Sequence, residues 1–442
     1  MVLLHAFFSL PHDPLPFAAR KIYLYCPHMA DAHQSSRAYC PDCGPAGVSH
    51  AIERWSVRAA TVIGIVEAPP AAIWRGIKPL VAKAHPGHAA PTIARFFAAF
   101  GLGEIVTRAD DKNNWRARVL WEEAERRGIV MREFRPFGLA REIFYASYGT
   151  DTRGFDGLPR PSAAHESSLD WMDDKGVILK KFRAAGIPVP RGGSVTTVKA
   201  AEKIFNAIVG PDSDDVVIVK PAIGSRSRHT YIHITDLEAL RRAFIKAKQL
   251  SPRVVVEEEL SGFVFRITLV GGKIAGIMRR EPPHVIGDGA RTVHQLITEE
   301  NNNPLRHGPI FHELPLGEET IAILKEQNLS LDSVPGAGRM VIIHPKVSRA
   351  YGASTTEMTD IHPDNEKLFL HIAKTLDDPL VGVDFMIDDM AKSWKEQKCG
   401  VIECNSLPFI DLHHFPLKGP TRNAAGAVWD LIFAASGSER AG

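Results

Sequence analysis

Two apolar segments in the last quarter of the chain each carry an acidic residue where a buried strand is expected. One reads LVGVDFMI over Leu380–Ile387, with Asp384 in its middle, and the other reads VIECN over Val401–Asn405. A carboxylate inside a buried strand is costly unless a cation or hydrogen bonds neutralise it. Glu403 and Asn405 are two positions apart, so on a strand their side chains face the same side.

These three side chains together offer hard oxygen ligands to a divalent cation. Mg²⁺ prefers such ligands and keeps waters and nucleotide phosphates in the rest of its coordination shell, with Mn²⁺ as an alternative ion. The competing interpretation is that the acids are partly buried and paired with Lys or Arg. We predict that Asp384, Glu403 and Asn405 bind Mg²⁺.

A hairpin is predicted in the middle of the chain. Phe265–Val270 and Lys273–Met278 are β-rich runs joined by two glycines, a sequence typical of a tight hairpin turn. The second run continues into Arg279 and Arg280. Guanidinium groups hold phosphate oxygens bidentately, so we predict that Arg280, together with Arg279, steadies a transferring phosphoryl group.

An acidic segment precedes this hairpin. Val254–Val256 is a short apolar run that meets Glu257-Glu-Glu-Leu-Ser-Gly262, and we expect the run to begin a second structural lobe. A carboxylate after a buried strand can accept a hydrogen bond from an adenine amino group. We therefore assign Glu257 to the adenine and expect backbone contacts from Glu259 and Leu260.

Other local patterns predict helices and place a lysine at the end of a strand. Leu169–Pro190 has helical spacing of apolar residues, and Thr235–Glu238 and Thr292–Gln295 have the pattern of helix-starting capping boxes. The apolar run Val216–Val219 predicts a buried strand that ends at Lys220, directly before a proline. A lysine at such a strand end can reach forward to phosphates.

From about Ser168 to about Leu412 the chain resembles the ATP-grasp ligases. The acidic segment, the hairpin and the run from Arg280 to Gly289, REPPHVIGDG, carry this resemblance. It is closest to the ATP-grasp parts of cyanophycin synthetase and bifunctional glutathione synthetase, and it extends to D-alanine–D-alanine ligase. It implies an α/β fold in which two α+β lobes sandwich ATP after a small α/β N-terminal domain.

The resemblance also implies roles for single residues. Lys175 and Lys220 would contact nucleotide phosphates, and Gly224 and Ser225 would lie in the loop that closes over them. Arg349 would lie near an acyl phosphate. The family pattern has a ribose-binding acid where this chain has Val264, and glycines where its phosphate loop has Ser227 and His229. Val264 implies weaker nucleotide affinity, a ribose held by another group, or a different nucleotide. The changes in the loop predict that it is stiffer and more cationic.

The length of 442 residues fits two or three domains. We predict a poorly structured extension over 1–55, an N-terminal α/β domain over 56–165 and an ATP-grasp domain over 166–435, with lobes at about 166–252 and 253–435. In the extension, Cys26, Cys40 and Cys43 include one C-x-x-C; they either bind zinc or are surface thiols, and a zinc ribbon would need two such pairs.

The composition is that of a soluble globular protein, with 45% apolar and 24% charged residues and a net charge of +2. No basic stripe indicates a nucleic-acid partner, and no apolar run reaches the roughly 20 residues of a spanning helix. The opening MVLLHAFFSL lacks the basic start of a signal peptide. We expect a cytoplasmic enzyme with small-molecule partners and leave a homo-oligomer open.

The function implied is an ATP-dependent carboxylate–amine ligase that uses ATP and Mg²⁺. The substrates would be an amino acid or peptide acid and an amine, joined through an acyl phosphate to give an amide, ADP and phosphate. Alternatives are a kinase on the same fold that forms a phosphate ester, and a nucleotide-binding module without turnover. No phosphate loop of the G-x-x-G-K-T type occurs, so we expect a single-step ligase rather than a complete cyanophycin synthetase.

Overall fold

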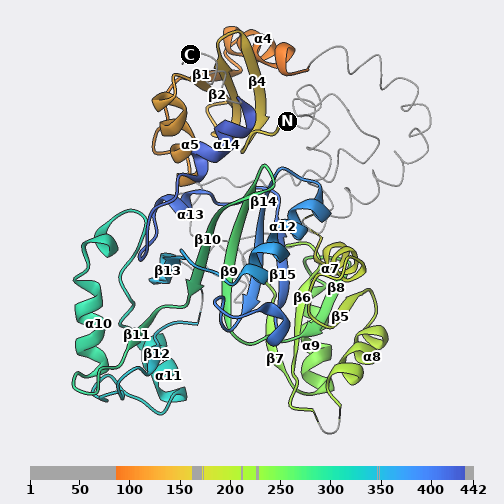
Figure 1. Cartoon of the computed structure of the whole chain (residues 1–442), viewed down its shortest axis with the longest axis vertical. Helices are drawn as coiled ribbons and strands as arrows, with labels where there is room; N and C mark the ends of the chain where they lie inside the picture. The colour runs from red at the N-terminus through yellow and green to blue at the C-terminus, as the bar shows by residue number, and fades with distance from the viewer. Residues whose placement is uncertain are drawn as a thin grey trace.

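The computed structural model of the chain describes residues 86–161, 172, 174–210, 213–224, 228–345, 347 and 349–433. The predicted extension over 1–55, its three cysteines and Ser225 lie outside these residues. None of the helices in the described ranges is both long and apolar enough to cross a membrane. Figure 1 shows the first sheet at one end of the long axis and the central sheet in the middle, with the second sheet and a two-stranded sheet on opposite sides of its lower part.

The first sheet is antiparallel, in the order β1-β2-β3-β4, and packs against two helices of its own and one from much later in the chain. Helix α5 begins where the Asn114 side chain accepts from the Ala117 amide. The later helix, α14, contributes Trp429, whose indole N–H donates to the Leu120 carbonyl oxygen at 2.9 Å. The elements are β1 Gly103–Val106, β2 Val130–Pro136, β3 Ile143–Tyr148, β4 Asp151–Asp156, α4 Pro86–Ala99, α5 Trp115–Arg126 and α14 Ala424–Ile432.

The second sheet has the order β5-β8-β6-β7. Strand β8 pairs with β5 on one side and β6 on the other, so the prediction that Val254 begins the second lobe is wrong: its run is apolar because both faces of a central strand are covered. Helix α9 is capped by Asp236, not by Thr235 as the capping-box pattern predicted. The elements are β5 Gly192–Val195, β6 Val217–Pro221, β7 Tyr231–Ile234, β8 Val254–Glu258, α7 Lys175–Ala184, α8 Val198–Ile208 and α9 Leu237–Ala247.

The third sheet lies at the centre of the molecule, in the order β13-β10-β9-β14-β15. Its members are β9 Phe263–Val270, β10 Lys273–Glu281, β13 Ser354–Glu357, β14 Leu380–Ile387 and β15 Gly400–Asn405. The hairpin of β9 and β10 turns at Gly271 and Gly272, both with positive φ, as predicted.

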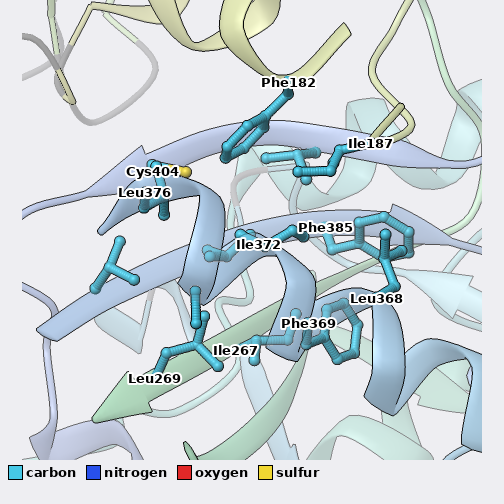
Figure 2. Close-up of a cluster of buried hydrophobic side chains, with 14 of the residues drawn as sticks. Phe182, Ile187, Ile267, Leu269, Leu368, Phe369, Ile372, Leu376, Phe385 and Cys404 are labelled. Atoms are coloured by element: carbon cyan, nitrogen blue, oxygen red, sulfur yellow. The ribbon is translucent and has the colours of Figure 1, made fainter. Parts of the chain in front are cut away.

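One face of the central sheet is covered by α12 (Pro363–Leu376). Figure 2 shows Ile267, Leu269 and Phe385 of the strands packed against Phe369 and Ile372 of this helix. Helix α7 of the second sheet joins the same cluster through Phe182, so the two lobes share an apolar core. Because side chains alternate along a strand, the residues between these apolar positions face the other side of the sheet.

A compact insert follows β10. Strands β11 (His284–Ile286) and β12 (Met340–Ile342) form a two-stranded sheet beside α10 (Val293–Asn301), the 3₁₀ helix η4 (Pro304–His307) and α11 (Glu318–Glu326). The Thr292 side chain and the Gln295 side chain form the predicted capping box at the start of α10. The buried Arg306 donates to the Gly352 carbonyl oxygen at 2.8 Å, which ties the insert to the loop before β13.

Candidate functional site

Charged side chains gather on the face of the central sheet that α12 does not cover. The register places Asp384 of β14 directly opposite Arg266 of β9 and directly opposite Glu403 of β15. Directly paired residues point to the same face. The register shifts between Asp384 and Phe385, where β15 has one extra residue, Ile402, opposite β14.

Asp384 is held by a bidentate ion pair with Arg266. Arg266 Nε lies 2.5 Å from Asp384 Oδ1 and its terminal nitrogen lies 2.9 Å from Oδ2. Burial raises the pKa of Asp384, but the Arg266 charge and hydrogen bonds outweigh it, so the pKa lies below its ordinary value. Asp384 is therefore a buried acid paired with Arg, as in the competing interpretation of the sequence. The NH1 nitrogen of Arg266 has no partner in the structure.

Arg280 of β10 is the second cation at this acid. Its Nη1 lies 3.8 Å from Asp384 Oδ2, and Arg280 keeps 27% of its side chain exposed. Burial lowers the pKa of Arg280 despite the nearby Asp384 charge, and the neighbouring Arg266 and Arg349 charges act in the same direction as burial. A site that crowds guanidinium groups in this way is suited to bind an anion.

Glu403 extends the charged face towards the second sheet. Its Oε1 lies 3.4 Å from the Nζ of Lys175, which also donates to the Gly224 carbonyl oxygen at 2.8 Å. Lys175 is fixed there because it is the first residue of α7, directly after Asp174, whose side chain caps the helix. The structure thus brings Lys175, Glu403 and the phosphate-loop glycine together.

The predicted metal ligands are brought onto adjacent strands, with Asn405 two positions beyond Glu403. The Nδ2 atom of Asn405 is buried without a partner. The described part of the chain has no group of three or more His, Cys, Asp or Glu side chains suited to a metal. Two carboxylates and an amide still fit the donor chemistry of Mg²⁺, with Asp384 shared with Arg266. The Mg²⁺ site stays a prediction.

Lys220 and Glu257 form a buried ion pair within the second sheet. Lys220 Nζ also donates to the Ile402 carbonyl oxygen of β15 at 3.3 Å, so this lysine spans the two lobes. Glu257 is 1% exposed and its Oε2 atom has no partner. The predicted adenine-binding acid therefore keeps an unused acceptor beside the lysine predicted to contact phosphate.

The segment after β8 offers fewer groups to a ligand than we predicted from the sequence. The Glu259 amide donates to the Val216 carbonyl oxygen at 2.9 Å, so only its carbonyl is left for a backbone contact with a ligand. Its side chain accepts from the His233 amide at 2.6 Å. Leu260 is buried. Val264, which the resemblance places at the ribose, lies directly opposite Arg280.

Arg279 does not join Arg280, which corrects the prediction that the two act together. The guanidinium of Arg279 lies over the Phe263 ring, 4.5 Å from its centroid, and pairs with Glu281 at 2.6 Å. Adjacent residues of β10 face opposite sides of the sheet, so only Arg280 reaches the charged face.

Arg349 lies beyond Arg280 and pairs with an acid that sequence reasoning missed. The 3₁₀ helix η5 (Arg349–Tyr351) carries it, and α13 (Asp411–His414) supplies Asp411, whose Oδ2 lies 2.6 Å from an Arg349 nitrogen. Arg280 donates to the Val347 carbonyl oxygen at 3.2 Å, which holds this loop at the charged face. Arg266 was also missed, although an arginine inside the apolar run FVFRITLV was a signal.

The chain is similar in sequence to several known proteins. The chain is 28% identical over 335 residues to a cyanophycin synthetase of Nostoc sp. The aligned region covers 73% of this chain and 36% of that protein. It is 32% identical over 270 residues to the glutathione biosynthesis bifunctional protein GshAB of Clostridium perfringens, covering 59% and 34%. The chain thus spans about a third of the length of these curated relatives. No family model matches it.

Among solved structures, a bifunctional glutathione synthetase from Pasteurella multocida superimposes with a TM-score of 0.54 at 24% identity, covering 72% of this chain and 43% of that one. This likeness shows the shared fold. The chain thus has the ATP-grasp fold and is similar in sequence to ATP-grasp ligases.

Proposed function

We propose that the protein is an ATP-dependent ligase that joins a carboxylate to an amine through an acyl phosphate, giving an amide, ADP and phosphate. The observation that carries the proposal is the meeting of Arg266 and Arg280 at Asp384 on one face of the central sheet, where the neighbouring Glu403 pairs with Lys175 of α7. Cations fixed in advance around a transferring phosphoryl group stabilise its charge without reorganisation.

The described residues suggest how each step would be supported. Lys175 and Lys220 would hold the nucleotide phosphates, and Glu257 would accept from the adenine amino group through its unpaired oxygen. The substrate carboxylate attacks the γ-phosphorus, the bond to ADP breaks, and Arg280 neutralises the transferring group. The amine then attacks the acyl carbon and phosphate leaves.

Mg²⁺ held by Glu403, Asn405 and Asp384 would supply charge neutralisation between the phosphates. The Nη1 atom of Arg266 is buried without a hydrogen-bond partner. The two lobes of this site would divide after β8, because β8 lies in the sheet of the first lobe.

An ADP-release screen with amino acids and dipeptides, each with and without Mg²⁺, tests the proposal. A ligase consumes one acid and one amine for every ADP formed, whereas a kinase gives a phosphate ester and needs no amine. Arg280→Gln should lose ADP release, and the matched variant Arg279→Gln, which alters the opposite face of the same strand, should keep it. Nucleotide binding without ADP release under every substrate pair would refute the ligase function.

A further inference from the structure

Arg306 is a buried cation to which the proposed reaction assigns no role. It lies in η4 of the insert, and its side chain is fully buried. A buried guanidinium is costly unless acceptors satisfy its donors. Glu300 of α10 supplies the countercharge, because its Oε1 accepts from Nε at 2.9 Å and from Nη2 at 2.8 Å. This ion pair neutralises Arg306 within the insert.

Two other contacts of Arg306 leave the insert. Nη1 donates to the Gly352 carbonyl oxygen at 2.8 Å, and Nη2 donates to the Ser354 hydroxyl at 3.3 Å. Both acceptors follow η5, the 3₁₀ helix that carries Arg349. One guanidinium therefore joins α10 of the insert to the segment between η5 and β13.

The segment that carries Arg349 is held at both ends by guanidinium groups. Before η5, the Val347 carbonyl oxygen accepts from Arg280 at 3.2 Å, and after η5 the Gly352 carbonyl oxygen accepts from Arg306. We call Val347, η5 and Gly352 together the Arg349 loop. Because β10 supplies one of these cations and the insert supplies the other, the position of Arg349 relative to Arg280 depends on both elements.

Two further contacts pack the Arg349 loop against the insert. Gly352 has a φ of +83°, which side chains disfavour, and a Cβ at this position would lie 2.8 Å from the Glu313 carbonyl oxygen. The ring of Tyr351 stacks on the ring of His344, which follows β12, with the ring centroids 4.2 Å apart. The insert is therefore the support on which the loop lies, and Arg306 supplies hydrogen bonds from that support.

We propose that Arg306 is a positioning residue that holds Arg349 beside Arg280 during the reaction. This inference rests on the proposed ligase function. Arg306 acts through the Gly352 carbonyl oxygen, and misplacing a group at a reaction site by about 1 Å can slow the reaction about 100-fold. The insert then contributes to the rate of the reaction although it lies beside the central sheet.

Arg306→Lys is the test variant, because an ammonium group keeps the charge pair with Glu300 but cannot span Glu300 and Gly352 as the guanidinium fork does. With the acid and amine that give the fastest ADP release, kcat should fall about tenfold to hundredfold, while KM for ATP stays within about twofold of the wild type. Gly352→Ala disturbs the same contact from the side of the loop and should give the same result. Thermal melting of each variant confirms that the rates are measured on folded protein.

Hydrogen exchange, followed by mass spectrometry, gives a readout that does not depend on activity. Peptides that contain η5 should lose protection in Arg306→Lys, whereas peptides from α10 should exchange as in the wild type. The matched control is Arg339→Gln, which removes an exposed arginine of the same insert that donates to the Gln327 carbonyl oxygen. This control should keep the kcat and the exchange of the wild type.

A lower melting temperature of Arg306→Lys with unchanged kcat and unchanged exchange at η5 would mean that Arg306 only stabilises the insert, and would overturn the proposal. So would a loss of ATP affinity as large as the loss of kcat, or an equal effect of Arg339→Gln. A wild type that forms no amide with any acid and amine would instead refute the ligase function. Exchange at η5 would then still decide whether Arg306 holds the loop.

Discussion

Arg266 and Asp384 form a buried, bidentate ion pair across the two central strands of the sheet. Arg266, which is always charged, therefore neutralises the buried carboxylate of Asp384. Asp384 therefore has a structural role besides the ligand role that its position suggested, and the two roles respond differently to substitution.

Asp384→Asn should destabilise the fold by about 3–5 kcal/mol, because the buried Arg266 would lose the charge that neutralises it. Urea denaturation measures this as a lower midpoint with an unchanged slope. The double variant Arg266→Met/Asp384→Asn is the control and should recover part of the loss. Wild-type stability in Asp384→Asn would contradict the importance of the pair.

Glu403→Gln should leave stability nearly unchanged and slow turnover about 100-fold to 1,000-fold. Glu403 keeps 30% of its side chain exposed and lies 3.4 Å from Lys175, a geometry that contributes little to folding. The rate is measured at saturating Mg²⁺. A variant that turns over near the wild-type rate would show that Glu403 is not a metal ligand.

Lys220→Ala should abolish stabilisation by ATP and also destabilise the free protein by about 3 kcal/mol, because Glu257 would be left as a buried, unpaired carboxylate. Thermal melting with and without Mg·ATP separates the two effects. Lys220→Ala/Glu257→Gln should regain stability without regaining the ATP response. An undiminished melting shift in Lys220→Ala would remove this lysine from the nucleotide site.

Val264→Asp should tighten ATP binding about fivefold to hundredfold by restoring an acceptor for ribose hydroxyls. Val264→Asn is the control for the shape of the site, because the Asn side chain has nearly the shape of Asp but carries no charge. The wild type should discriminate poorly between ATP and its 2′-deoxy analogue, as titration of both would show. A strong wild-type preference for ATP would mean that another residue accepts from the ribose.

Asp215 should give the protein an acid-dependent component of stability. Lys398, Ser213 and Arg191 lower the pKa of Asp215 from 3.8 to about 2. A lowered folded-state pKa stabilises the native state above the unfolded pKa, and the contribution disappears as the pH falls from 3.8 through about 2. The free energy of unfolding of Asp215→Asn should therefore change less with pH over this range than that of the wild type. The same pH dependence of the free energy of unfolding in both proteins would contradict the prediction.

The sequence predicted those features that local patterns encode. The hairpin at Gly271-Gly272 and the capping box at Thr292 depend on neighbouring residues, and both were confirmed. The local sequence also indicates that Arg279 and Arg280 point in opposite directions, because adjacent residues of a strand face opposite sides. That prediction failed because both arginines were expected to act on one group, whereas within β10, which continues to Glu281, they face opposite sides.

Partners that are distant in the sequence could not be predicted from local patterns. Arg266 and Asp384 are 118 positions apart, and no periodicity states that β9 and β14 are neighbours. The apolar run at Val254 is equally compatible with either sheet, since a fully covered strand has no preferred face. Asp411 lay in a short helix with no motif, so its pairing with Arg349 emerged only from the fold.

The packing of α14 on the first sheet makes that unit discontinuous in the sequence. The chain leaves the unit after β4, builds both lobes and the insert, and returns to seat Trp429 against α5. During synthesis the first sheet would therefore be made long before the helix that covers it. Its completion requires closure of a very long loop, which is entropically slow. Until α14 is made, the apolar face of α5 that Trp429 covers lacks this partner.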